Sequence, residues 1–160
     1  MIRVLFVIAL LALTELPAPE PAQLGLATAR VFAPPTVLFQ IRDVGAATPA
    51  SSATTVSFDN AILILGQALR ISVKADGDIV MPGGGLIPST TLAWTASNAT
   101  NGIGMHGSLN KLTYTPVFQG NANATAGGVN LSWTLSAPGG SVTAGTGAAT
   151  LRWKFEAITP

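Results

Sequence analysis

The sequence predicts an all-β domain, an antiparallel β-sandwich that follows an N-terminal signal peptide. Three segments alternate apolar and polar residues with the period of two that a half-buried strand requires. Clusters of Gly, Pro, Asn and Asp separate these segments from further short stretches rich in β-branched residues. The chain has 160 residues, which fits a single domain, and only 9% of them are charged.

The N-terminus has the pattern of a secretory signal peptide. A basic residue, Arg3, precedes an unbroken apolar run over residues 4–13. This run is too short for a membrane span, which needs about 20 apolar residues. Ala27-Thr28-Ala29 is a small-residue cleavage site. We therefore expect a signal peptide over residues 1–29, a sandwich domain over residues 30–160, and a location outside the cytoplasm, secreted or at the cell surface.

The strongest strand predictions come from strict alternation. Its apolar members are Leu69, Ile71, Val73 and Ala75 in the first segment, Val129, Leu131, Trp133 and Leu135 in the second, and Leu151, Trp153, Phe155 and Ala157 in the third. Each strand is expected to have one buried and one solvated face, as in antiparallel sheets. A helix would place Trp153 and Phe155 on different sides, so the helical interpretation fails.

Other segments are predicted in chain order from composition. Residues 17–35 are rich in Pro and Ala and are expected to form a linker or a remnant of the leader. Strands are expected at residues 36–44, 54–65 (as two pieces around Asp59 and Asn60), 91–97 and 112–118. The total of about seven to nine strands is typical of a sandwich.

Composition excludes several function classes. The net charge of +1 offers no broad basic patch for nucleic acid. The absence of cysteine removes disulfides, thiol nucleophiles and Cys-ligated metals. His106 is the single histidine, and nothing in the spacing links it to a serine and a carboxylate. We expect no enzyme activity, catalytic residue, cofactor or metal.

Two motifs are better explained by turns and loops than by ligands. Residues 102–107 read Gly-Ile-Gly-Met-His-Gly, which matches G-x-G-x-x-G, but no helix pattern follows it, as a dinucleotide site requires. Asp76 and Asp78 flank Gly77, and no further acidic residues follow to complete a calcium loop. A turn between strands is the simpler interpretation of this segment.

Two sets of residues are candidate binding elements. Val37, Phe39 and Ile41 share one face of an apolar strand that follows a Pro-rich segment, so this strand either closes its own sheet or completes the sheet of a neighbouring subunit. Trp94 and Tyr114 are the aromatic residues that would stack on a sugar if their rings were exposed; core packing is the alternative.

The C-terminal third resembles exported bacterial surface proteins. An Ala144-Gly145-Thr146 turn leads into a long alternating last strand, as in pilin-like and spore-coat-U-like subunits. Residues 133–135 (Trp-Thr-Leu) and, more loosely, 153–155 (Trp-Lys-Phe) are similar to the motif of WxL-type cell-wall domains. The resemblance implies an Ig-like or pilin-like sandwich used for assembly or adhesion.

These observations favour an exported structural or adhesive cell-surface protein whose partners are its own copies or other surface proteins. Strand pairing would make it a fibre subunit. Two alternatives are a secreted glycan-binding module, with a glycan as partner, and a small outer-membrane β-barrel, whose strands also alternate apolar and polar residues. No transmembrane helix is expected in the mature chain.

Overall fold

The computed structural model describes residues 28–138 and 142–160 and confirms the all-β prediction. Its elements are β1 (Thr28–Phe32), β2 (Thr36–Ile41), β3 (Thr48–Pro49), β4 (Thr54–Ile62), β5 (Ala68–Ala75), β6 (Ile79–Val80), β7 (Leu86–Ile87), the 3-10 helix η1 (Ser89–Thr91), β8 (Leu92–Thr100), β9 (Gly102–Gly104), β10 (Gly107–Ser108), β11 (Thr115–Gly120), β12 (Gly127–Leu135) and β13 (Gly145–Ile158).

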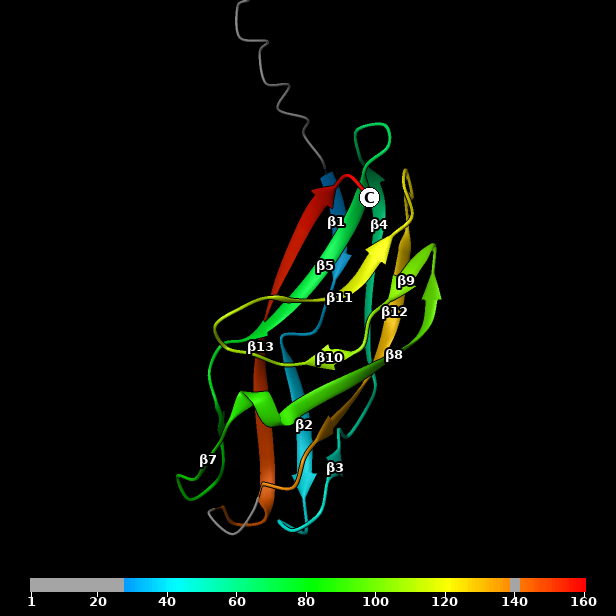
Figure 1. The fold of residues 1–160 in the computed structure, drawn as a ribbon. Helices are drawn as coiled ribbons and strands as arrows, with labels where there is room; N and C mark the ends of the chain where they lie inside the picture. The colour runs from blue at the N-terminus through cyan, green and yellow to red at the C-terminus, as the bar shows by residue number, and fades with distance from the viewer. Residues whose placement is uncertain (1–27, 139–141) are drawn as a thin grey trace, which may run out of the picture.

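The strands form two antiparallel sheets that pack face to face. The first sheet has the order β1-β4-β12-β8-β10, with β3 paired to β12. The second has the order β7-β6-β13-β5-β11-β9, with β2 paired to β13. Figure 1 shows that β13 runs along most of the length of the molecule, and that the first strand and the C-terminus lie at the same end. Between the sheets lies one apolar core, to which β12 contributes four side chains: Val129, Leu131, Trp133 and Leu135.

The strands predicted from alternation are present with the expected inner faces, except at one end. β5 and β12 bury all their predicted apolar residues. β13 buries its predicted apolar residues only as far as Leu151, because Trp153 is half-buried and Phe155 is 42% exposed. The expected burial of this face was wrong at Phe155, whereas Trp153, which was predicted as a core residue, is partly buried and packs against the core.

The linker prediction for residues 17–35 was wrong at residues 28–32, whereas residues 33–35 do connect two strands. Residues 28–32 form β1, which pairs antiparallel with β4 and partly buries Val31 against the core. The predicted leader, residues 1–29, falls outside the described residues except for Thr28 and Ala29, which are the first two residues of β1.

Two other boundaries differ from the prediction. β4 is one strand rather than two pieces, and Asn60 takes a positive φ of 50° within it, where the register with β1 shifts. β11 begins at Thr115, so Leu112 and Tyr114 precede it. The backbone N–H of Leu112 donates a hydrogen bond to the Asn110 side chain, which forms a turn instead of a strand.

Candidate functional site

The predicted assembly strand closes its own sheet. Val37, Phe39 and Ile41 are all under 5% exposed and belong to the core. Their strand, β2, pairs with residues 145–150 of β13 in the same chain. Because all three side chains are buried within their own chain, they offer no surface to a neighbouring subunit.

Trp94 is buried, so of its two interpretations core packing is confirmed and sugar stacking is excluded. The side chain is 2% exposed, and its indole N–H donates a 2.7 Å hydrogen bond to the backbone oxygen of Met105. Its ring packs against Trp133 with the centroids 5.0 Å apart. The apolar environment between the sheets and a partner for the N–H explain why the ring is inside.

Tyr114 is 38% exposed, but its ring faces cations. The Lys74 ammonium lies 5.0 Å from the ring centroid and that of Lys154 lies 6.0 Å away, which is within the range of cation–π attraction. Because Trp94 is buried, the two predicted aromatics do not form a joint platform for a sugar.

The Gly-rich motif is part of the sheets rather than a loop, which corrects the loop interpretation. Gly102 and Gly104 lie in β9, and Gly107 lies in β10. A Cβ atom on Gly104 would come within 2.7 Å of Val129 Cγ2, and one on Gly107 within 2.9 Å of the Trp94 ring. Close packing of backbone against core side chains therefore accounts for these glycines.

The acidic turn is held by ion pairs. Asp78 accepts hydrogen bonds from the Lys111 ammonium, at 2.6 Å, and from the Ser89 backbone N–H, at 3.0 Å, and these lower its pKa. Asp76 pairs with Arg152, which raises the pKa of that guanidinium. Both carboxylates already have partners, and no cluster of three His, Cys, Asp or Glu residues suited to a metal occurs in the described part of the chain.

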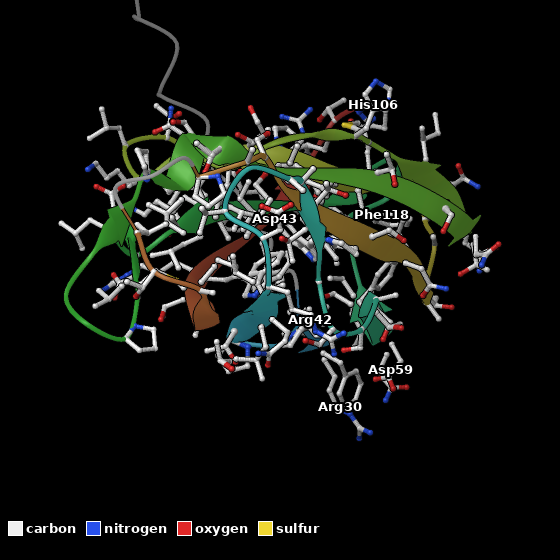
Figure 2. All side chains as sticks on the ribbon, turned by 90° about the horizontal axis from the view of Figure 1, so that it is seen from below. Arg30, Arg42, Asp43, Asp59, His106 and Phe118 are labelled. Carbon is white, nitrogen blue, oxygen red and sulfur yellow. The ribbon has the colours of Figure 1, made fainter. Side chains whose placement is uncertain are left out.

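His106 lies at the surface between β9 and β10. Figure 2 shows its side chain on the opposite side of the molecule from Asp59. Across residues 28–138 and 142–160, no ion pair joins His106 to a carboxylate. The geometry therefore assembles no acid–base pair around this histidine.

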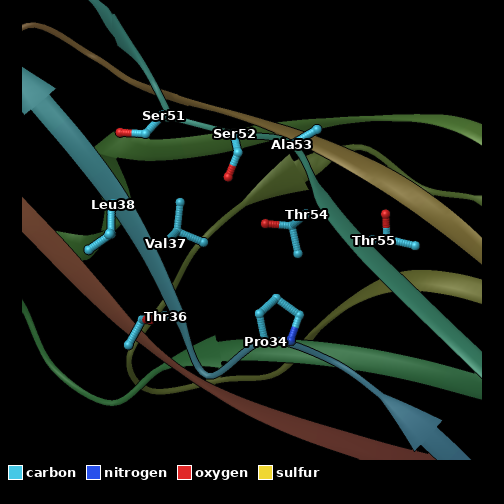
Figure 3. Close-up of a pocket in the computed structure, with 9 residues that line it drawn as sticks. All are labelled: Pro34, Thr36, Val37, Leu38, Ser51, Ser52, Ala53, Thr54 and Thr55. Atoms are coloured by element: carbon cyan, nitrogen blue, oxygen red, sulfur yellow. The ribbon is translucent and has the colours of Figure 1, made fainter.

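A hydroxyl-lined groove of about 360 Å³ lies where β2 faces the start of β4 (Figure 3). Its lining residues are Pro34, Thr36, Val37, Leu38, Ser51, Ser52, Ala53, Thr54 and Thr55. None of them is charged, and the Thr54 hydroxyl accepts a hydrogen bond from the buried Trp133 indole. The groove can offer hydrogen bonds to a polar partner, but it carries no nucleophile paired with a base.

The sandwich is open at the corner where β1 and the last part of β13 face each other. A groove of about 190 Å³ separates these two strands and is lined by Thr28, Ala29, Val31, Leu63, Leu69, Phe155 and Ala157. The lining carries no charge. It holds the exposed ring of Phe155, and exposed Ile62, Ile64 and Leu65 belong to the adjoining end of β4 and the turn after it. Most of the lining side chains are apolar, and we take the open corner, defined by the seven lining residues, as the candidate site.

Both strands that flank the open corner have an unpaired backbone edge. β1 pairs with β4 on one side, and no described strand lies on its other side. β13 pairs with β5 through residues 151–158, whereas β2 covers its opposite edge only over residues 145–150. The Leu151 N–H donates to Pro35 at 2.7 Å and is the last covered group. The edge of residues 152–158 is thus without a partner strand among the residues that the structure describes.

Sequence reasoning missed the open corner because it depends on which strands become neighbours. No signal in the sequence revealed it: the alternation of the last predicted strand, from Leu151 to Ala157, is no longer than the strand predicted over residues 36–44, whereas the observed β13 has 14 residues. Comparisons with protein-family models, with curated proteins and with solved structures found no match for this chain. Within the described residues, no helix has the length and apolar character needed to cross a membrane. The class that the fold defines is therefore an all-β sandwich with an open corner.

Proposed function

We propose that this protein is an exported structural or adhesive domain of the cell surface, which acts by binding other protein chains at its open corner. The observation that carries the proposal is the pair of unpaired strand edges beside an apolar groove. Free backbone N–H and C=O groups at a sheet edge form a template for another strand. Peptide recognition by strand addition combines these hydrogen bonds with pockets for side chains.

The remaining features support contact rather than chemistry. The linings of the two grooves described above hold no nucleophile–base pair and no charged side chain. The basic Arg3 and the apolar run over residues 4–13 support export, and a cysteine-free chain of low charge suits a surface protein stabilised by its core alone. Its partners are expected to be its own copies or other surface proteins.

Cell fractionation with protease treatment of intact cells tests this proposal. We expect the protein outside the cytoplasm and accessible to added protease. A strain without it should lose cell–cell or cell–surface attachment, or the integrity of its surface layer. Recovery of the protein only with cytosolic markers, or an intact surface phenotype together with a measurable catalytic activity, would overturn the proposal.

A further inference from the structure

The free edge of β13 has the length, hydrogen-bond pattern and charge order to pair with itself. We propose that a second copy of this chain docks there, antiparallel and related by a two-fold axis at Phe155, so that the second sheets of two copies become one continuous sheet. The inference rests on the proposed function, because it names the partner that the open corner receives. The argument has four parts, which are length, backbone direction, charge and apolar cover.

The first part is length. The free edge covers residues 152–158, because the Leu151 N–H is bound to Pro35 and β13 ends at Ile158. Phe155 is the middle residue of this edge. A two-fold axis at Phe155 therefore pairs the whole free edge with its copy, residue 152 opposite residue 158, and leaves the segment that β2 covers undisturbed.

The second part is backbone direction. In an antiparallel ladder the backbone groups of alternate residues point to opposite neighbours. The Leu151 N–H points to the β2 side, and the register with β5 is regular from Leu151 to Ile158. The N–H and C=O groups of Trp153, Phe155 and Ala157 therefore point to the free edge. In the proposed register Phe155 of one copy lies opposite Phe155 of the other, and Trp153 lies opposite Ala157. Every residue whose N–H and C=O groups point to the free edge therefore faces another such residue.

The third part is charge. Lys154 and Glu156 flank the central residue and lie on the outer face of the sheet, where they form an ion pair within the chain at 2.7 Å. In the proposed register Lys154 of each copy lies directly opposite Glu156 of the other copy. The two-fold axis therefore produces two such pairs. These positions are non-hydrogen-bonded pairs, in which the side chains are closest. Opposite charges there are attractive, whereas the lysines that usually protect an edge would repel.

The fourth part is apolar cover. Phe155 is 42% exposed and lines the groove of the open corner together with Leu69 and Ala157. In the dimer its ring becomes a direct cross-strand neighbour of the same ring in the second copy, and aromatic cross-strand pairs are stabilising. The contact is small for a protein interface, so we expect reversible, concentration-dependent association. An isologous contact of this kind closes at two copies.

Charge exchange tests the register. Sedimentation of the purified exported chain up to about 1 mM should show dimers. Lys154→Glu or Glu156→Lys alone should weaken dimerisation by about 10- to 100-fold, because like charges then face each other at both pairs. The double exchange Lys154→Glu/Glu156→Lys should restore it. An equimolar mixture of the two single variants should form mixed dimers. The Lys154→Glu variant carries two carboxylates on this edge, and the Glu156→Lys variant carries two ammonium groups opposite them. Arg42→Glu, an equal change of charge just beyond β2, is the matched control and should have no effect.

A cysteine crosslink tests the two-fold axis without relying on charge. Because the chain contains no cysteine, Phe155→Cys introduces a single thiol that lies opposite its own copy. Cα atoms of a hydrogen-bonded antiparallel pair are about 5.5 Å apart, which suits a disulfide. Mild oxidation should crosslink Phe155→Cys but not Arg152→Cys, whose two copies lie near opposite ends of the paired edge.

Two results would overturn the inference. One is a chain that stays monomeric at about 1 mM. The other is association that ignores both the charge exchange and the position of the thiol. In the second case the chain would associate through another surface, and the proposed surface function would stand. Failure of the proposed function would instead appear in the fractionation experiment, which does not depend on this register.

Discussion

Truncation of Trp133 should remove most of the stability of the domain. Trp133 is 2% exposed, packs against Trp94 and donates its indole N–H to the Thr54 hydroxyl at 3.0 Å. Replacement of a buried Trp by Ala typically costs about 3–5 kcal/mol. The change also leaves the hydroxyl of Thr54, which is 6% exposed, without this partner, for about 1–3 kcal/mol more. Domains of this size are stable by about 5–15 kcal/mol, so Trp133→Ala should be barely folded.

The same substitution at Trp153 provides the comparison. Trp153 is half-buried at the open end of β13, and its N–H donates to the Pro34 backbone oxygen at 2.8 Å. Because part of its side chain already contacts solvent, Trp153→Ala should lower the free energy of unfolding by about half as much as Trp133→Ala or less, roughly 1–3 kcal/mol. Thr134→Ala, on the exposed side of β12, should change stability by less than about 0.5 kcal/mol.

Urea denaturation followed by far-UV circular dichroism measures all three variants. The expected order of unfolding midpoints is Thr134→Ala above Trp153→Ala above Trp133→Ala. Equal midpoints for the two tryptophan variants would show that the two positions are equally covered, and the reasoning about the open end of β13 would then be wrong.

Two further predictions concern packing and pH. Gly104→Ala should destabilise the fold by about 1–3 kcal/mol in the same assay, because its Cβ has no space between the sheets, whereas Gly77→Ala should be nearly neutral because nothing lies within 4 Å of the added atom. The lowered pKa of Asp78 means that its carboxylate stabilises the fold at pH values above its ordinary pKa of 3.8, and that this contribution is lost as the pH falls below that value. Thermal unfolding of Asp78→Asn should therefore give a lower Tm than the unaltered chain at about pH 6, with the difference shrinking below about pH 4. A difference that grows in acid would contradict the assigned ion pair.

Much of the fold could be predicted from periodicity, because alternation reports the face of a strand. It worked for β5 and β12, each of which is covered by the opposite sheet along its length. It failed at Phe155, because alternation cannot say how far the opposite sheet extends. It also missed β3, β6, β7, β9 and β10, which have only two or three residues each and thus no detectable period.

The candidate site was predictable only in part. The sequence left Trp94 open between core packing and sugar binding, because an aromatic residue in a strand has the same sequence signature whether its ring lies in the core or on the surface; the structure places it in the core. The strand of Val37, Phe39 and Ile41 was identified, but its partner was not, since strand pairing is set by the whole topology. The open corner combines residues from β1, the turn after β4, β5 and β13, and β1 and β13 are far apart in sequence.

Hydrogen exchange at single amides of β13 tests the central claim most directly. The N–H groups of Trp153, Phe155 and Ala157 point to the free edge, whereas those of Arg152, Lys154 and Glu156 point to β5. In dilute solution the first three should exchange rapidly and the second three slowly. As the protein concentration rises, the exchange of Trp153, Phe155 and Ala157 should slow to approach that of their neighbours. If these three amides exchange rapidly at every concentration while the chain associates, pairing through the β13 edge is contradicted.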